Sequence, residues 1–221
     1  TSTSNNLLGT SIKSLIPNLE LIDWVLEYIY NWTILNRVRN KDKRITIILA
    51  NYPVKNGRLA NGVGLDTPES LYNIIKWLAE EGYYLGNSTL PKNSLELINT
   101  LLNSRTNDPE SFSKKPLDFL PLEQYLTKWK TFNKSVQDKI IKRWGQPSSA
   151  IELENKCFPI HGIRFGNICI LLQPSRGYDH ENINDLHSPD LPPPHRYIAQ
   201  YLWIKNTFNS HAVIHLGKHG S

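Results

Sequence analysis

Ile45-Thr46-Ile47-Ile48-Leu49-Ala50 is a short, continuous and β-branched apolar run, which is typical of a buried parallel strand. Residues 51–66 follow at once, and their glycines and proline are incompatible with regular structure. Thr67 and Pro68 then begin a helical apolar pattern that ends near Gly82. A strand, a Gly-rich loop and a capped helix form half of an α/β unit, so we predict an α/β fold.

The second half of the chain adds strands to this sheet. Residues 163–165 and 168–172 flank Gly166-Asn167 and predict a hairpin. A helix is expected over about 194–208, and a last strand over 212–216. We therefore predict a parallel or mixed sheet with flanking helices.

The chain divides into three regions that differ in composition and in the spacing of their apolar residues. Residues 1–15 are rich in Ser, Thr and Asn and are expected to be frayed or looped, whereas about 17–40 has helical spacing. Residues 83–150 are polar and irregular, with helical patterns at 93–103, 121–131 and 134–144. We predict an N-terminal helical segment (1–44), an α/β core (45–82 and 151–221) and an inserted helical segment (83–150).

Composition narrows the class of protein. The 221 residues are 39% hydrophobic with a net charge of +5, which excludes disorder of the whole chain. No apolar run approaches the roughly 18 residues of a membrane span. The basic stretch 37–44 is too short to predict nucleic-acid binding. No signal pattern is visible, so cytoplasm is the expected location.

Both ends of the sequence look cut. There is no Met, and the chain stops at His219-Gly220-Ser221 inside a Gly-rich stretch. We therefore expect a fragment of a larger multidomain protein.

Three polar loops, residues 51–66, 173–194 and 217–221, each follow a predicted strand. In open α/β sheets, ligands bind at the carboxyl ends of the strands. We expect the three loops to converge on one cleft. The first loop ends at a helix N-terminus that favours an anion, but it matches no nucleotide motif, and a turn that simply needs glycines is an open alternative.

The other two loops concentrate Arg, Tyr, Asp and His side chains, although a merely solvated loop is an open alternative for 173–194. His215 and His219 are four residues apart, but the glycines around them argue against a helix and no Glu follows His215, so a zinc protease is disfavoured. They could act as bases or transient metal ligands, or be structural histidines. His211 lies at the strand's entrance and is expected to be structural. A serine esterase is disfavoured because no GxSxG elbow is present.

Four motifs occur in an order that resembles one family: the large, tetrapyrrole-binding subunit of class I metal chelatases, which includes CobN-type cobaltochelatase and its magnesium chelatase relatives. They lie within about 45–82 and 160–221. They are Asn51-Tyr52-Pro53 with Asn61-Gly62-Val63-Gly64-Leu65-Asp66-Thr67-Pro68, then Gln173-Pro174-Ser175-Arg176-Gly177-Tyr178, then His187-Ser188-Pro189-Asp190-Leu191-Pro192-Pro193-Pro194-His195, and Val213-Ile214-His215-Leu216-Gly217-Lys218-His219-Gly220.

The details are more similar to the cobalt branch, because the long Pro-rich loop and Lys218 are present. The resemblance implies insertion of Co²⁺, as the substrate metal, into a hydrogenobyrinate-type corrinoid in cobalamin biosynthesis. ATP, with Mg²⁺, would be hydrolysed by an AAA+ ATPase subunit and its adaptor subunit, and the isolated fragment would be inactive. A magnesium chelatase acting on protoporphyrin IX and a non-catalytic tetrapyrrole-binding module are the alternatives.

The resemblance also implies roles for individual residues. His215, His219 and Lys218 would be catalytic, and the two histidines would hold the metal transiently. The residues expected to bind the macrocycle are Arg176, Tyr178, His187, Asp190, His195, Asn51, Tyr52 and Asp66. The family's downstream Glu lies beyond Ser221, and the resemblance assigns no role to residues 83–150.

Overall fold

The computed structural model describes residues 2–5, 10–13, 17–51, 64–87, 89–177 and 191–217. These residues form two compact units, Thr1–Val38 and Arg39–Ser221. None of the helices in the described residues combines the length and the apolar composition of a bilayer-spanning helix.

The N-terminal unit holds two short strands and one long helix. Strands β1 (Ser2–Asn5) and β2 (Thr10–Lys13) pair antiparallel. The expectation that residues 1–15 are looped is therefore wrong for these positions, which include Thr, a residue type that favours extended backbone. Helix α1 (Leu19–Arg37) follows the N-cap Asn18, whose side chain accepts a hydrogen bond from the Leu21 N–H.

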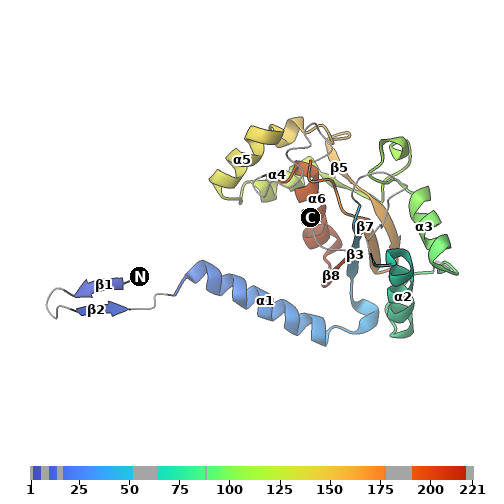
Figure 1. The fold of residues 1–221 in the computed structure, drawn as a ribbon, viewed down its shortest axis with the longest axis horizontal. Helices are drawn as coiled ribbons and strands as arrows, with labels where there is room; N and C mark the ends of the chain where they lie inside the picture. Colours follow the sequence, from blue (N-terminus) through green and yellow to red (C-terminus); the bar gives the residue numbers. More distant parts are fainter. Residues whose placement is uncertain are drawn as a thin grey trace. The chain divides into compact units, whose positions relative to one another are not determined.

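The larger unit is built on a four-stranded mixed sheet in the order β6-β7-β3-β8 (Figure 1). Strand β3 (Ile45–Leu49) runs parallel to β7 (Ile168–Leu172) and to β8 (Ala212–Leu216), and all its residues are buried. Strand β6 (Gly162–Phe165) forms the predicted hairpin with β7. The α/β fold and the mixed sheet are confirmed.

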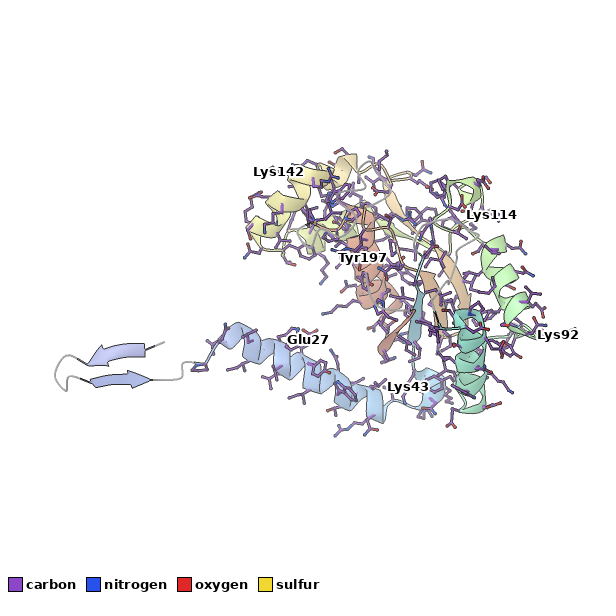
Figure 2. The ribbon with its side chains drawn as sticks, viewed as in Figure 1. Glu27, Lys43, Lys92, Lys114, Lys142 and Tyr197 are labelled. Carbon is purple, nitrogen blue, oxygen red and sulfur yellow. The ribbon has the colours of Figure 1, made fainter. Side chains whose placement is uncertain are left out.

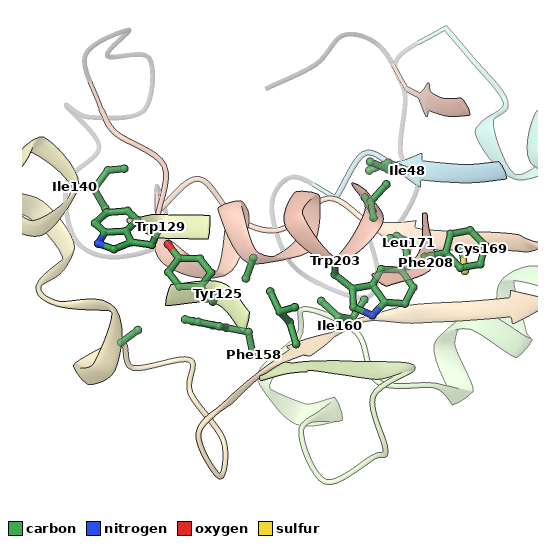
Figure 3. Close-up of a cluster of buried hydrophobic side chains, with 14 residues drawn as sticks. Ile48, Tyr125, Trp129, Ile140, Phe158, Ile160, Cys169, Leu171, Trp203 and Phe208 are labelled. Carbon is green, nitrogen blue, oxygen red and sulfur yellow. The ribbon is translucent and has the colours of Figure 1, made fainter. Parts of the chain in front are cut away.

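Alternate side chains of each strand point to opposite faces of the sheet, as the pleat requires. Each face packs against its own hydrophobic core. Ile47 and Ile170 face helices α2 (Thr67–Glu80) and α3 (Ser94–Asn103). Ile48 and Leu171 face the other core, which receives α4 (Leu122–Trp129), α5 (Lys134–Trp144) and α6 (His195–Trp203). In Figure 3 this second core extends from Ile140 at one end to Phe208 at the other. The π-helical turn η6 (Ile204–Phe208) continues α6 and contributes Phe208.

Residues 83–150 are more than an appended helical segment. Helices α3, α4 and α5 coincide with the three predicted helical patterns, but a strand, β4 (Asp118–Pro121), lies before α4 and pairs antiparallel with β5 (Cys157–Ile160). The buried residues Leu120, Tyr125 and Trp129 belong to the second core. The segment therefore completes the packing on one face of the sheet.

The larger unit also contains three short 3₁₀ turns: η1 (Asn40–Asp42), η3 (Pro109–Ser111) and η4 (Pro147–Ser149).

The α2 N-cap is Asp66, one residue before the expected Thr67, because a carboxylate at that position accepts the Glu69 N–H at 3.0 Å. Lys114 and Lys142 are exposed and lie at the periphery of the larger unit (Figure 2).

Candidate functional site

Three parallel strands end side by side at one edge of the sheet. Leu49 at the end of β3 is in register with Leu172 of β7 and with Leu216 of β8. Asn51, Gln173 and Gly217 therefore begin the three polar loops from neighbouring positions. The predicted common edge is confirmed for these loop exits, whereas residues 52–63, 178–190 and 218–221 lie outside the described residues.

Two buried amides at this edge have atoms without a partner. Asn51 is 5% exposed, and its Oδ1 accepts no hydrogen bond within the described residues. Gln173 is 8% exposed; its Oε1 accepts from the Tyr201 hydroxyl at 3.1 Å, but its Nε2 has no partner there. An unpaired buried polar atom costs about 1–3 kcal/mol. Within the described part of the chain, one acceptor and one donor without partners thus lie at the ends of adjacent strands, where a polar ligand could bind.

His215 lies on β8 next to Tyr201 of α6. The Tyr201 hydroxyl is 3.5 Å from His215 Nε2, and the rings are nearly parallel at 18° with centroids 6.1 Å apart. His215 is exposed, and the partial burial of its ring lowers its pKa, so the neutral form, which can accept a proton, is favoured. Tyr201 lies within the helix expected over about 194–208, and no local motif marks it as a neighbour of His215.

Arg176 and Asp66 both make local structural contacts. Arg176 donates to the Leu191 carbonyl at 3.3 Å and joins the two ends of the loop that follows β7. Asp66 is exposed and caps α2, as described above. Their expected contacts with a macrocycle stay predictions.

His195 lies inside the second core and is 1% exposed. It contacts the Tyr125 hydroxyl through Nδ1 at 2.8 Å and the Gly145 carbonyl through Nε2 at 3.0 Å. Burial lowers the pKa of this imidazole as well. His211, by contrast, accepts the Arg44 N–H at 2.9 Å, in agreement with its expected structural role.

The remaining predicted site residues, Tyr52, Tyr178, His187, Asp190, Lys218 and His219, lie outside the described residues. Among the positions that the structure describes, no three His, Cys, Asp or Glu side chains are grouped to hold a metal ion. The proposed pairing of His215 with His219 around a metal therefore stays a prediction.

A cavity of about 310 Å³ adjoins this edge of the sheet and was not anticipated from the sequence. Its polar lining includes Arg105, Asn107, His161 and Arg196. Asn107 Nδ2 donates to the Gln173 carbonyl at 2.8 Å, which connects the cavity to the end of β7. These residues are far apart in the sequence and belong to no motif, so no local signal could identify them.

Hydrogen bonds within the cavity define the state of His161. Arg196 Nη2 donates to His161 Nδ1 at 2.5 Å and to Asn107 Oδ1 at 2.5 Å. Because a guanidinium only donates, Nδ1 must accept, and the ring is neutral. Burial, together with the positive charges of Arg196 and Arg105, holds the pKa of His161 far below its ordinary value.

Comparison with known proteins agrees with the order of the motifs. The sequence profile of the CobN/Magnesium Chelatase family matches residues 1–221. The aerobic cobaltochelatase subunit CobN of Pseudomonas aeruginosa is 36% identical over 203 residues, which is 91% of this chain and 16% of that protein. The H subunit of the magnesium chelatase of Chlorobaculum parvum is 30% identical over 191 residues, 86% of this chain and 14% of that protein.

A solved structure extends the agreement to the fold. The catalytic subunit of cobaltochelatase from Mycobacterium tuberculosis superposes with a TM-score of 0.82 at 28% identity, covering 99% of this chain and 18% of that one. This chain therefore spans about a sixth of the length of the relatives it matches. On these matches, the chain belongs to the CobN/magnesium chelatase family.

Proposed function

We propose that this chain is part of the tetrapyrrole-binding large subunit of an ATP-dependent cobaltochelatase. The reaction would insert Co²⁺ into a hydrogenobyrinate-type corrinoid, with ATP hydrolysed by an AAA+ partner subunit that acts through an adaptor. Family membership supports the proposal, as does the 36% identity to a CobN subunit.

The observation that carries the proposal is the shared edge of β3, β7 and β8. Asn51, Gln173 and His215 lie at or next to the carboxyl ends of these three strands. The side chains of Asn51 and Gln173 each have one buried amide atom without a partner among the described residues. A macrocycle with polar arms would supply the missing partners. The amides could bind an arm, while His215 lies close enough to the edge to act on the ring.

Metal insertion exchanges two pyrrolic protons for one divalent ion, so it needs proton acceptors and a means of stripping water from the ion. A neutral imidazole serves both needs, since it accepts a proton and binds a borderline metal. We assign these roles to His215 and His219. Arg176, Tyr178 and Lys218 would orient the macrocycle, with His187, Asp190 and Tyr52 nearby, because guanidinium and ammonium groups bind carboxylate arms.

Magnesium chelatase is the second candidate, favoured by the 30% identity to a magnesium chelatase of Chlorobaculum parvum. The cobalt assignment has the higher identity and the long Pro-rich loop with Lys218 in its favour.

The proposal is tested in a full-length subunit with its ATPase partners by measuring macrocycle affinity and metal insertion separately. Arg176→Ala should weaken binding of the metal-free corrinoid. His215→Ala should leave binding nearly unchanged and stop insertion of Co²⁺. His211→Ala is the matched control, because His211 lies at the opposite end of β8, and it should retain insertion. Equal loss of affinity in both site variants, with a lowered melting temperature, would contradict the assigned roles.

A further inference from the structure

We infer that the cavity around Arg196 and Arg105 is a binding site for a single carboxylate group, and that it receives one carboxylate arm of the macrocycle. This inference rests on the proposed function and deepens it. No motif of the sequence points to Arg196, Arg105, His161 or Asn107, and their assignment depends on contacts within the folded chain.

Among the described residues no carboxylate lies within ion-pair distance of Arg196, although Glu152 and Glu154 lie near enough to act on its charge. Its Nη2 donates to Asn107 Oδ1 and His161 Nδ1, which are both neutral acceptors, and it forms no ion pair in that part of the chain. A half-buried cation needs an anion or water to replace its lost solvation. Burial lowers the pKa of Arg196 to about 10, which agrees with incomplete solvation. Since the described bonds use only Nη2, the rest of the planar fork is available for a bidentate contact.

Arg105 supplies an independent observation. Its side chain is 5% exposed, and its Nη1 and Nη2 bind the carboxylate of Glu154. Its guanidinium also lies over the Phe112 ring, 4.7 Å from the centroid. Its Nε, however, is buried without a partner among the described residues. A second cavity residue therefore has a donor that lacks an acceptor.

The charge of the lining selects the kind of anion. Glu152 and Glu154 line the same cavity as the two arginines. The cavity therefore has no large positive excess, and a doubly charged phosphate would be repelled by the two carboxylates. A single carboxylate, with two acceptor oxygens and one charge, matches the available donors.

Volume and position indicate what bears this carboxylate. A cavity of about 310 Å³ admits a short side chain, whereas a tetrapyrrole ring with all its arms is much larger. Ser175 and Gly177, which flank Arg176, are part of the lining. Because Asn107 also bonds to the Gln173 carbonyl, an arm could enter the cavity from a ring bound at the sheet edge.

The test uses the full-length subunit and two probes: a metal-free corrinoid with free carboxylate arms, and the same corrinoid with those arms methyl-esterified. Wild type should bind the free acid more tightly. Arg196→Gln should weaken binding of the free acid by about 10- to 100-fold, the range for a charge-assisted hydrogen bond. Binding of the ester should change little. Arg39→Gln is the matched control, because Arg39 is exposed and pairs with Asp42 near the opposite end of β3.

Each outcome bears on the inference. A smaller preference for acid over ester in Arg196→Gln, with Arg39→Gln like wild type, supports it. An unchanged preference in Arg196→Gln, or equal loss of acid and ester binding, overturns it. If Arg196→Gln does not fold, Arg196→Lys takes its place and should lose part of the preference. A wild-type preference for the acid that Arg196→Gln leaves unchanged overturns the inference alone. Equal wild-type binding of acid and ester also contradicts the arm contacts proposed for Arg176 and Lys218, and a subunit that binds neither probe overturns the proposed function as a whole.

Discussion

A hydrogen bond between Tyr125 and His195 joins α4 to α6 inside the second core. Both side chains are at most 1% exposed, and Trp129 packs edge-on against the imidazole. Because the Gly145 carbonyl can only accept, His195 Nε2 carries the proton and Nδ1 accepts from the Tyr125 hydroxyl. Both ring nitrogens of His195 are therefore hydrogen-bonded within the fold.

We predict that His195→Ala lowers the free energy of unfolding by about 2–4 kcal/mol at pH 7.5, because it leaves a void and an unpaired phenol. The penalty should shrink as the pH falls below about 6.5. Burial lowers the pKa of His195 in the folded chain, so as the pH falls the unfolded chain binds a proton at this imidazole before the folded chain does. The free energy of unfolding of wild type therefore falls by up to ~1.4 kcal/mol per pH unit, and His195→Ala, which lacks the imidazole, does not share this loss.

Urea unfolding followed by Trp fluorescence between pH 5 and 7.5 measures both effects. Tyr125→Phe is the control that removes the hydroxyl and keeps the ring, and it should cost less than His195→Ala. A His195→Ala variant with wild-type stability and lost macrocycle binding would instead assign His195 to the site.

At the scale of elements, helix α5 supports the loop after β7. Trp144 at the end of α5 donates from Nε1 to the Pro192 carbonyl at 2.7 Å. A Cβ added to Gly177 would overlap the Trp144 ring, and the Gly177 φ of +91° is in the region that favours glycine. Trp144 of the inserted segment thus contacts both ends of the loop that carries Arg176. This contact gives the end of α5 a role in positioning that loop.

Gly177→Ala should lower the free energy of unfolding by more than Gly82→Ala and weaken macrocycle binding in the full-length subunit. Both glycines have positive φ, but a Cβ on Gly82 would meet nothing within 4 Å. Gly82→Ala should therefore cost only the backbone strain, about 1–2 kcal/mol, while Gly177→Ala adds a clash. Urea titrations and corrinoid affinity measure the two effects. Equal penalties in the two variants would show that the Trp144 contact does not constrain the loop.

Much of this arrangement was predictable from local patterns. The β-branched runs at 45–49 and 168–172 and the periodic helices were visible because burial imposes a repeat on the sequence. β4 was missed, because four residues ending in Pro121 carry too little alternation to indicate a strand. The cavity was missed for a different reason. Arg105, His161 and Arg196 come from three distant segments, and their proximity depends on tertiary packing.

At the scale of the whole chain, the two units differ in how they bury apolar surface. Both described cores consist of residues from Arg39–Ser221. Helix α1 in the other unit exposes large apolar side chains, including Trp24 at 62%, Tyr28 at 52% and Trp32 at 60%. Contiguous exposed apolar surface of this kind promotes association.

Deletion of residues 1–38 should leave the melting temperature of the remaining chain nearly unchanged and reduce self-association. The described cores lose no residue, while the exposed apolar helix is removed. Sedimentation velocity and thermal melts of the 221-residue chain and the deletion variant test this. Loss of a cooperative melt in the deletion variant would contradict it.

The central position of β3 has a consequence for synthesis on the ribosome. Strand β3 ends at Leu49, but its neighbour β7 begins only at Ile168, and β8 later still. At about 5–20 residues per second, a nascent β3 waits on the order of 6–24 s before its first partner strand is translated. During that time Ile45-Thr46-Ile47-Ile48-Leu49, an uncharged β-forming segment, has both edges unpaired. The nascent chain therefore depends on chaperones, or on early packing against α2, to keep this strand from pairing with another chain.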